Sequence, residues 1–132
     1  MIVIDASAVV EVLLDTDLGR RIEQRVWGDA AEMANAPHLL DTEVLQVLSR
    51  LVRSRRLAAE HANHLVGDLV DLDLRRHGHS DLLERAFEMR DSVTAYDAMY
   101  LALAEALGGV LLTCDAKLGK AHGSPAKVEV LS

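Results

Sequence analysis

The sequence predicts an α/β fold, a three-layer sandwich in which a mostly parallel central sheet is flanked by helices. Two observations carry this expectation. Short apolar runs of strand length alternate along the chain with longer amphipathic segments. Aspartates also follow closely after two of these runs, where parallel strands hand over to helices. At 132 residues the chain has the length of one domain, and we expect residues 1–132 to fold as a single unit.

The first strand is expected over residues 1–4, an apolar run that ends directly at Asp5. A helical pattern continues to Leu13, and after a turn rich in Asp and Gly a second amphipathic helix is expected over residues 20–27. Residues 33–38 predict only a weak strand, because a proline interrupts the run. The first part of the chain therefore reads as strand, two helices and strand.

The middle of the chain is expected to be mainly helical. Strong apolar periodicity predicts a helix over residues 39–56, and another helix is expected over residues 59–69. Apolar and acidic residues alternate over residues 70–74, which predicts a strand with one solvated face. A polar loop over residues 75–79 and a helix over residues 80–89 complete this part.

The stretch 92–118 packs a helix, a strand and the start of another helix into a short segment. Thr94 suits the N-cap of the first helix, Asp97 falls at its third position, and a pair of glycines after Leu107 ends it. The apolar residues 110–113 then predict a strand buried on both faces. Two further elements are expected to close the chain: a helix end and loop over residues 117–125 and an edge strand over residues 128–131.

Composition restricts how this chain can hold a nucleic acid. The formal net charge of -7 argues against broad attraction to phosphate backbones, although it is compatible with a contact bridged by metal ions. Only 3% of the residues are aromatic, so Trp27 and Phe87 cannot form a base-stacking platform. Any nucleic acid would have to be held by other means.

The sequence favours a reducing compartment. A lone cysteine, Cys114, cannot form an intramolecular disulfide. The chain opens without the basic region and apolar stretch of a secretory leader, and no segment reaches the ~20 apolar residues of a membrane span. We therefore expect a cytoplasmic protein that makes no membrane contact.

Four acidic residues occupy comparable places, either just after a predicted strand or in an early turn of a helix: Asp5, Glu43, Asp97 and Asp115. In an open parallel sheet these places lie along the carboxyl edge, where ligands bind. Taken singly, each acid is explained well by stabilisation of a helix N-terminus. Four like charges at one edge need a cation, and hard oxygen ligands without Cys or His favour Mg²⁺ or Mn²⁺. Such ions would support hydrolysis of a phosphodiester by a bound water, without a protein nucleophile.

At these residues the chain resembles the PIN-domain ribonucleases of the VapC toxin type. The resemblance covers almost the whole chain and is carried by three stretches: IVIDAS, PHLLDTEVLQVLSRL and TAYDAMYLALAEALGGVLLTCDAKL. It implies a PIN-like sandwich, Mg²⁺-dependent endoribonuclease activity with Mn²⁺ able to substitute, a homodimer, and inhibition by a small VapB-like antitoxin. By position, it also implies that the metal-binding catalytic acids are Asp5, Glu43, Asp97 and Asp115.

Several other side chains have two explanations each. The resemblance places the hydroxyls of Ser7, Thr94 and Thr113 beside the acids, but a helix cap or a strand end explains them equally well. Four arginines lie near the end of the 39–56 helix: Arg50, Arg53, Arg55 and Arg56. They would either contact RNA or interact favourably with the negative end of the helix dipole. Tyr96 and Tyr100 lie one helical turn apart and are expected to pack or to line a dimer contact.

Two functions from other classes compete with a ribonuclease toxin. The first is a phosphoryl-accepting signalling or phosphatase domain on a related scaffold. An aspartate-nucleophile phosphatase usually has a second acid two residues after the first, where this chain has Ser7. The second is a binding module whose acids accept a basic peptide. Labelling by a phosphoryl donor tests the first alternative, and metal-dependent cleavage of RNA by pure protein excludes the second.

Overall fold

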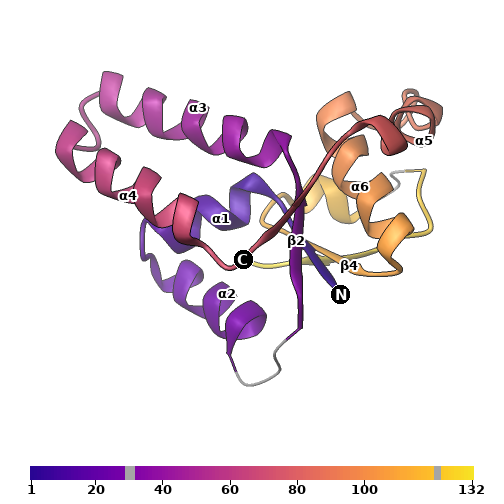
Figure 1. Cartoon of the computed structure of the whole chain (residues 1–132), viewed down its shortest axis with the longest axis horizontal. Coiled ribbons are helices and arrows are strands. Elements are labelled where there is room, and N and C mark those ends of the chain that lie inside the picture. The colour runs from indigo at the N-terminus through magenta and orange to yellow at the C-terminus, as the bar shows by residue number, and fades with distance from the viewer. Residues whose placement is uncertain (29–31, 121–122) are drawn as a thin grey trace.

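The computed structural model describes residues 1–28, 32–120 and 123–132, so residues 121–122 of the predicted 117–125 loop lie outside the described part. The elements in chain order are β1 (Ile2–Ile4), α1 (Ala6–Leu13), α2 (Asp17–Trp27), β2 (Ala34–Pro37), α3 (Leu39–Arg53), α4 (Ala59–Asp71), β3 (Arg75–His77), η1 (Ser80–Leu82), α5 (Leu83–Glu88), α6 (Ala95–Leu107), β4 (Val110–Thr113), η2 (Ala116–Gly119) and β5 (Lys127–Val130). Helices α1 to α4 lie on one side of the sheet and α5 and α6 on the other (Figure 1). This arrangement confirms the predicted three-layer sandwich.

The five strands of the described chain form one sheet in the order β3-β2-β1-β4-β5, and every neighbouring pair is parallel. The chain steps outward from β1 to β2 and β3, then returns to build β4 and β5 on the other side of β1. The direction of winding therefore reverses between β1 and β4. In open parallel sheets the carboxyl ends of such a strand pair frame the ligand-binding crevice.

Apolar packing fixes the central strands. Ile2, Val3 and Ile4 are fully buried, and β4 contributes two more fully buried leucines. Gly108 ends α6 with φ 62°, a left-handed conformation that suits glycine, as expected for this helix stop. A Cβ on Gly109 would lie 2.6 Å from the carbonyl oxygen of Met1, so only glycine lets β4 start this close to β1.

The predicted strand over residues 70–74 is wrong. Helix α4 continues to Asp71, because Leu65 and Leu69 lie one turn apart and are both buried, while Val70 faces solvent. Residues 75–77, predicted to be loop, form the edge strand β3 beside β2. Its charged side chains are tolerated because only one side of an edge strand is paired.

Three other expectations hold. The strand near residues 33–38 exists as β2, the last strand lies at the edge beside β4, and Asp97 is the third residue of α6. No helix in the described ranges is long and apolar enough to cross a membrane.

Candidate active site

Asp5 lies at the carboxyl end of β1 and caps α1. Its Oδ1 accepts a hydrogen bond from the backbone N–H of Ala8 at 3.1 Å, which satisfies a free donor of the first helical turn. The residue is only 7% exposed. The capping role expected for Ser7 is therefore performed by Asp5, and the serine hydroxyl is used elsewhere.

Two hydroxyl groups hold the Asp5 carboxylate and tie β1 to the end of β4. Ser7 donates to Oδ1 at 2.6 Å and accepts from the backbone N–H of Cys114 at 3.0 Å. Thr113 donates to Oδ2 of Asp5 and accepts from the backbone N–H of Asp115 at 3.0 Å. Each hydroxyl thus uses both its donor and an acceptor lone pair, and one lone pair of Oδ2 stays available to a ligand.

Glu43 projects from the second turn of α3, and Tyr100 on α6 holds its side chain. The phenol of Tyr100 donates to Oε1 of Glu43 at 2.6 Å. Tyr100 is only 2% exposed, so the expected dimer contact does not apply to it. The other carboxylate oxygen of Glu43 accepts no hydrogen bond from the described residues, which leaves it free for a ligand.

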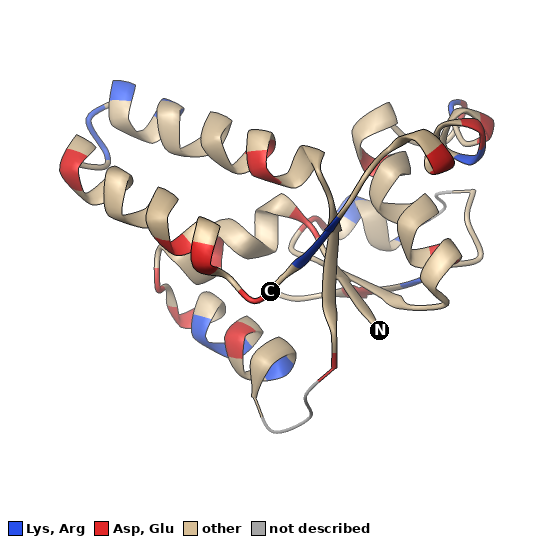
Figure 2. Cartoon of the chain, in the orientation of Figure 1, with Lys and Arg blue, Asp and Glu red and all other residues tan. Residues whose placement is uncertain are grey.

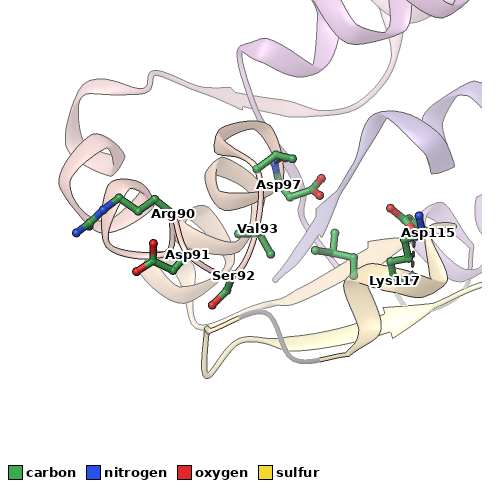
Figure 3. Close-up of a pocket in the computed structure, with 9 residues that line it drawn as sticks. Arg90, Asp91, Ser92, Val93, Asp97, Asp115 and Lys117 are labelled. Carbon is green, nitrogen blue, oxygen red and sulfur yellow. Dashed lines mark hydrogen bonds between the residues drawn. The ribbon is translucent and has the colours of Figure 1, made fainter.

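Asp97 and Asp115 face each other across a pocket of about 560 Å³ (Figure 3). Asp97 belongs to the first turn of α6, where Thr94 is the N-cap and accepts from the Asp97 N–H at 3.2 Å. Asp115 caps the short helix η2 by accepting from the Lys117 N–H at 2.9 Å. Arg90 also lines the pocket, but its side chain points away from both carboxylates (Figure 3).

Burial and mutual repulsion disfavour the charged state of three of these acids. Burial raises the pKa of Asp5, and the charge of Asp97 adds to the effect, against the hydrogen bonds that Asp5 accepts. Burial likewise raises the pKa of Glu43, with further contributions from the charges of Asp5 and Asp97. The pKa of Asp97 is raised by burial and by the charge of Asp115. The four acids therefore form one electrostatically coupled group.

The chemistry of this group fits a hard divalent cation. All donors are carboxylate oxygens, coupled like charges are relieved by a cation, and free lone pairs remain on Asp5 and Glu43. Within the described residues, however, no three His, Cys, Asp or Glu side chains converge closely enough to hold a metal ion as they stand. For one cation to contact three of these carboxylates, the side chains would have to lie closer together than they do here.

The structure brings all four predicted acids to the carboxyl edge of the sheet: Asp5 follows β1, Glu43 lies on α3, Asp97 lies on α6, and Asp115 precedes η2. The sequence interpretation missed Tyr100 as the partner of Glu43. A signal for it existed, because Tyr100 lies three residues after Asp97 and so shares its face of α6.

The chain folds as a three-layer sandwich around a parallel sheet, and electrostatically coupled carboxylates lie where the strand order reverses. These features define an α/β domain with an acidic site that attracts cations. The chain belongs to the PIN domain family, whose model matches residues 2–123.

Comparisons with individual proteins agree with this assignment. Ribonuclease VapC12 of Mycobacterium tuberculosis is 37% identical over 133 residues, and the match covers 100% of each chain. The crystal structure of PAE2754 from Pyrobaculum aerophilum has a TM-score of 0.66 and 22% identity, covering 98% of this chain and 83% of that one. The crystal structure of Mycobacterium tuberculosis VapC20, described as a sarcin-ricin loop cleaving toxin, has a TM-score of 0.60 and 17% identity, covering 84% of this chain and 87% of that one. The two structures share the fold.

Proposed function

We propose that residues 1–132 form a single PIN domain that acts as a Mg²⁺-dependent endoribonuclease, with Mn²⁺ able to substitute. The observation that carries the proposal is the coupled group of Asp5, Glu43, Asp97 and Asp115, whose pKa values are raised at three members. A full-length relative named a ribonuclease supports the choice of RNA as substrate.

In this proposal all four carboxylates take part in binding the cation. The chemistry that Mg²⁺ supplies when bound is a lowered pKa of a water molecule and stabilisation of the leaving oxygen. Ser7 and Thr113 keep the Asp5 carboxylate fixed through their hydrogen bonds, and Tyr100 orients Glu43. These three side chains act as positioning residues, because their hydroxyls bond to the acids.

The arrangement argues against a phosphoryl-accepting aspartate. Such a reaction needs a strongly nucleophilic Asp5 oxygen, whereas hydrogen bonds from Ser7 and Ala8 to Oδ1 and from Thr113 to Oδ2 reduce the nucleophilicity of both oxygens. The hydroxyl of Ser7, at the place of the second acid, is itself committed to Asp5 and to the Cys114 N–H. Hydrolysis by an activated water requires no such attack.

The same resemblance to VapC proteins leads us to propose that the chain is the toxin of a toxin-antitoxin pair. A small VapB-like antitoxin would inhibit it, and the toxin would form a homodimer. An arginine of the antitoxin that enters the acidic site could satisfy two carboxylates with one planar fork and displace the cation. Inhibition would then require no change of fold.

RNA cleavage by purified protein tests the enzymatic part. We expect cleavage of RNA with Mg²⁺ or Mn²⁺ and none with EDTA, and new 5′ ends mapped in total RNA after brief expression would identify the substrate. Labelling of Asp5 by a phosphoryl donor, or cleavage that persists in EDTA, would contradict the proposal.

A further inference from the structure

We propose that a second pocket, on the α3 side of the acids, is a nucleotide-binding subsite in which Tyr96 stacks on one RNA base. This inference rests on the proposed ribonuclease function and adds the part of the site that grips the substrate. The pocket measures about 570 Å³ and is lined by residues of α1, α3 and the first turn of α6.

The pocket is continuous with the acidic site. Glu43 and Ser7 both line it, and Ser7 is hydrogen-bonded to Asp5. Asp97 follows Tyr96 directly in the chain and lines the other pocket, with Asp115 (Figure 3). The acids therefore lie between two open pockets, as a centre that cuts within a strand requires, because nucleotides on both sides of the scissile bond need room.

Tyr96 is the aromatic side chain of this protein best placed to take a base. It is 63% exposed and lines the pocket. Tyr100 is buried against Glu43, and the Trp27 indole N–H is bonded to the carbonyl oxygen of Asp73. The ring of Phe87 is covered by the Arg90 guanidinium at 4.6 Å. The low aromatic content excludes an extended platform, but one exposed ring beside the acids is enough to stack one base.

The remaining wall of the pocket suits the rest of a nucleotide. Arg50, on α3, offers a cation for a phosphate, and it forms no ion pair with any residue the structure describes. Gln46 and Thr42 lie between Arg50 and the start of α3 and present amide and hydroxyl groups that can bond to a base edge. Along α3, the acidic residues lie at the end of the helix near β2, and the basic residues lie at the opposite end (Figure 2).

These features favour RNA over a peptide as the occupant. With a net charge of -7, the protein cannot rely on general attraction to phosphates, so stacking and one placed arginine must supply affinity near the acids. The cation of Arg50 has an anionic partner in an RNA phosphate, which a basic peptide would not supply. A stacked base beside a phosphate contact satisfies both Tyr96 and Arg50.

Binding of a fluorescein-labelled pool of random single-stranded RNA, followed by anisotropy, tests the subsite directly. Asp97→Asn serves as the background, so that the RNA is not cut during the measurement. Tyr96→Leu should weaken binding about 5-fold to 100-fold, the range expected for one stacked base, and Tyr96→Phe should restore it. Arg50→Gln should weaken binding and lower its salt dependence. Arg53→Gln is the matched control, because Arg53 lies on the same helix but lines the groove toward α4.

Kinetics in the cleaving protein provide the second readout. Tyr96→Leu should raise KM far more than it lowers kcat, because a stacked base outside the reacting bond contributes uniform binding. Gln46→Ala should broaden the base preference at one position beside the cleavage site in mapped RNA ends.

The outcomes separate this inference from the proposed function. If the wild type cleaves RNA with Mg²⁺ and Tyr96→Leu matches it in affinity and KM, the subsite is wrong and the ribonuclease stands. If Tyr96→Leu loses only binding to the antitoxin, the pocket belongs to the protein partner and the inference is overturned. If no cleavage occurs but RNA binding depends on Tyr96, the subsite is supported and the enzymatic proposal fails. If the folded protein binds no RNA, both fail.

Discussion

The phenol of Tyr100 donates a 2.6 Å hydrogen bond to Glu43, a residue 57 positions earlier in the chain. The bond joins α6 to α3, the two helices that stand on opposite sides of the sheet (Figure 1). Burial raises the pKa of Tyr100 well above its ordinary value, with the neighbouring Glu43 adding to the effect, so the phenol remains a donor at any physiological pH. One buried tyrosine therefore holds one of the proposed catalytic acids in place.

We expect Tyr100→Phe to fold but to lose both stability and activity. The substitution leaves a half-buried carboxylate oxygen without its donor, at a cost of ~1 kcal/mol or more in the free energy of unfolding. Because the hydrogen bond opposes the raised pKa of Glu43, its loss should shift the acid limb of the pH-activity profile upward. Urea unfolding and the pH dependence of kcat/KM measure the two effects. An unshifted profile would show that Tyr100 has only a packing role.

The metal-free protein should become more stable as the pH falls from neutral. The pKa values of Asp5, Glu43 and Asp97 are raised in the folded state, so above the unfolded value of about 4 the folded form binds more protons than the unfolded form. The contribution of these groups is thus most favourable below that pH and is lost as the pH rises through the folded pKa values. Unfolding in EDTA across this range measures the slope, and Asp97→Asn should flatten it.

A divalent cation should relieve the same repulsion. At neutral pH, Mn²⁺ or Mg²⁺ at a hundredfold excess over its dissociation constant should add ~2.7 kcal/mol to the free energy of unfolding. Thermal melts with EDTA and with millimolar Mn²⁺ provide the comparison. Identical melting temperatures in the two conditions would count heavily against a metal site.

Asp97→Asn and Thr94→Ala should have opposite effects. Asparagine keeps the shape of Asp97 but removes a coupled charge, so we expect equal or higher stability without metal, a smaller gain from Mn²⁺, and RNA cleavage slower by orders of magnitude. Thr94→Ala removes the acceptor for the Asp97 N–H and should cost ~1 kcal/mol of stability while retaining much of the activity. A folded Asp97→Asn protein that cleaves RNA normally with Mg²⁺ would exclude this acid as a ligand.

Expression in a host should reveal the toxin role. The chain alone should slow growth, and co-expression of a small reading frame that neighbours its own gene should restore growth. In the purified complex, replacing the arginine that enters the acidic site should release the inhibition. Unimpaired growth and no bound partner would end the toxin part of the proposal and leave the nuclease part untouched.

Local sequence patterns were enough to identify most of the elements. Thr94 and Gly108 bound α6 through backbone requirements that only neighbouring residues decide, so its limits could be predicted. The apolar residues of β1 and β4 likewise marked strands that are buried on both faces. Residues 70–74 were misread because alternation over five residues fits a strand and also the end of an amphipathic helix.

The sequence by itself determined the fold class, the strands that precede Asp5 and Asp115, and the acids as a group, because these follow from local patterns and the rules of parallel sheets. Only the tertiary structure decided the hydrogen-bond partners. Thr113 meets Asp5 across 108 positions of sequence, and Ser7 meets the Cys114 N–H across 107. No local pattern encodes such pairs, because each hydroxyl could instead have formed its hydrogen bonds with the backbone of its own turn. The pairing of β1 with β4 brings these groups together, and the burial of Asp5 and Thr113 strengthens the bond between those two side chains.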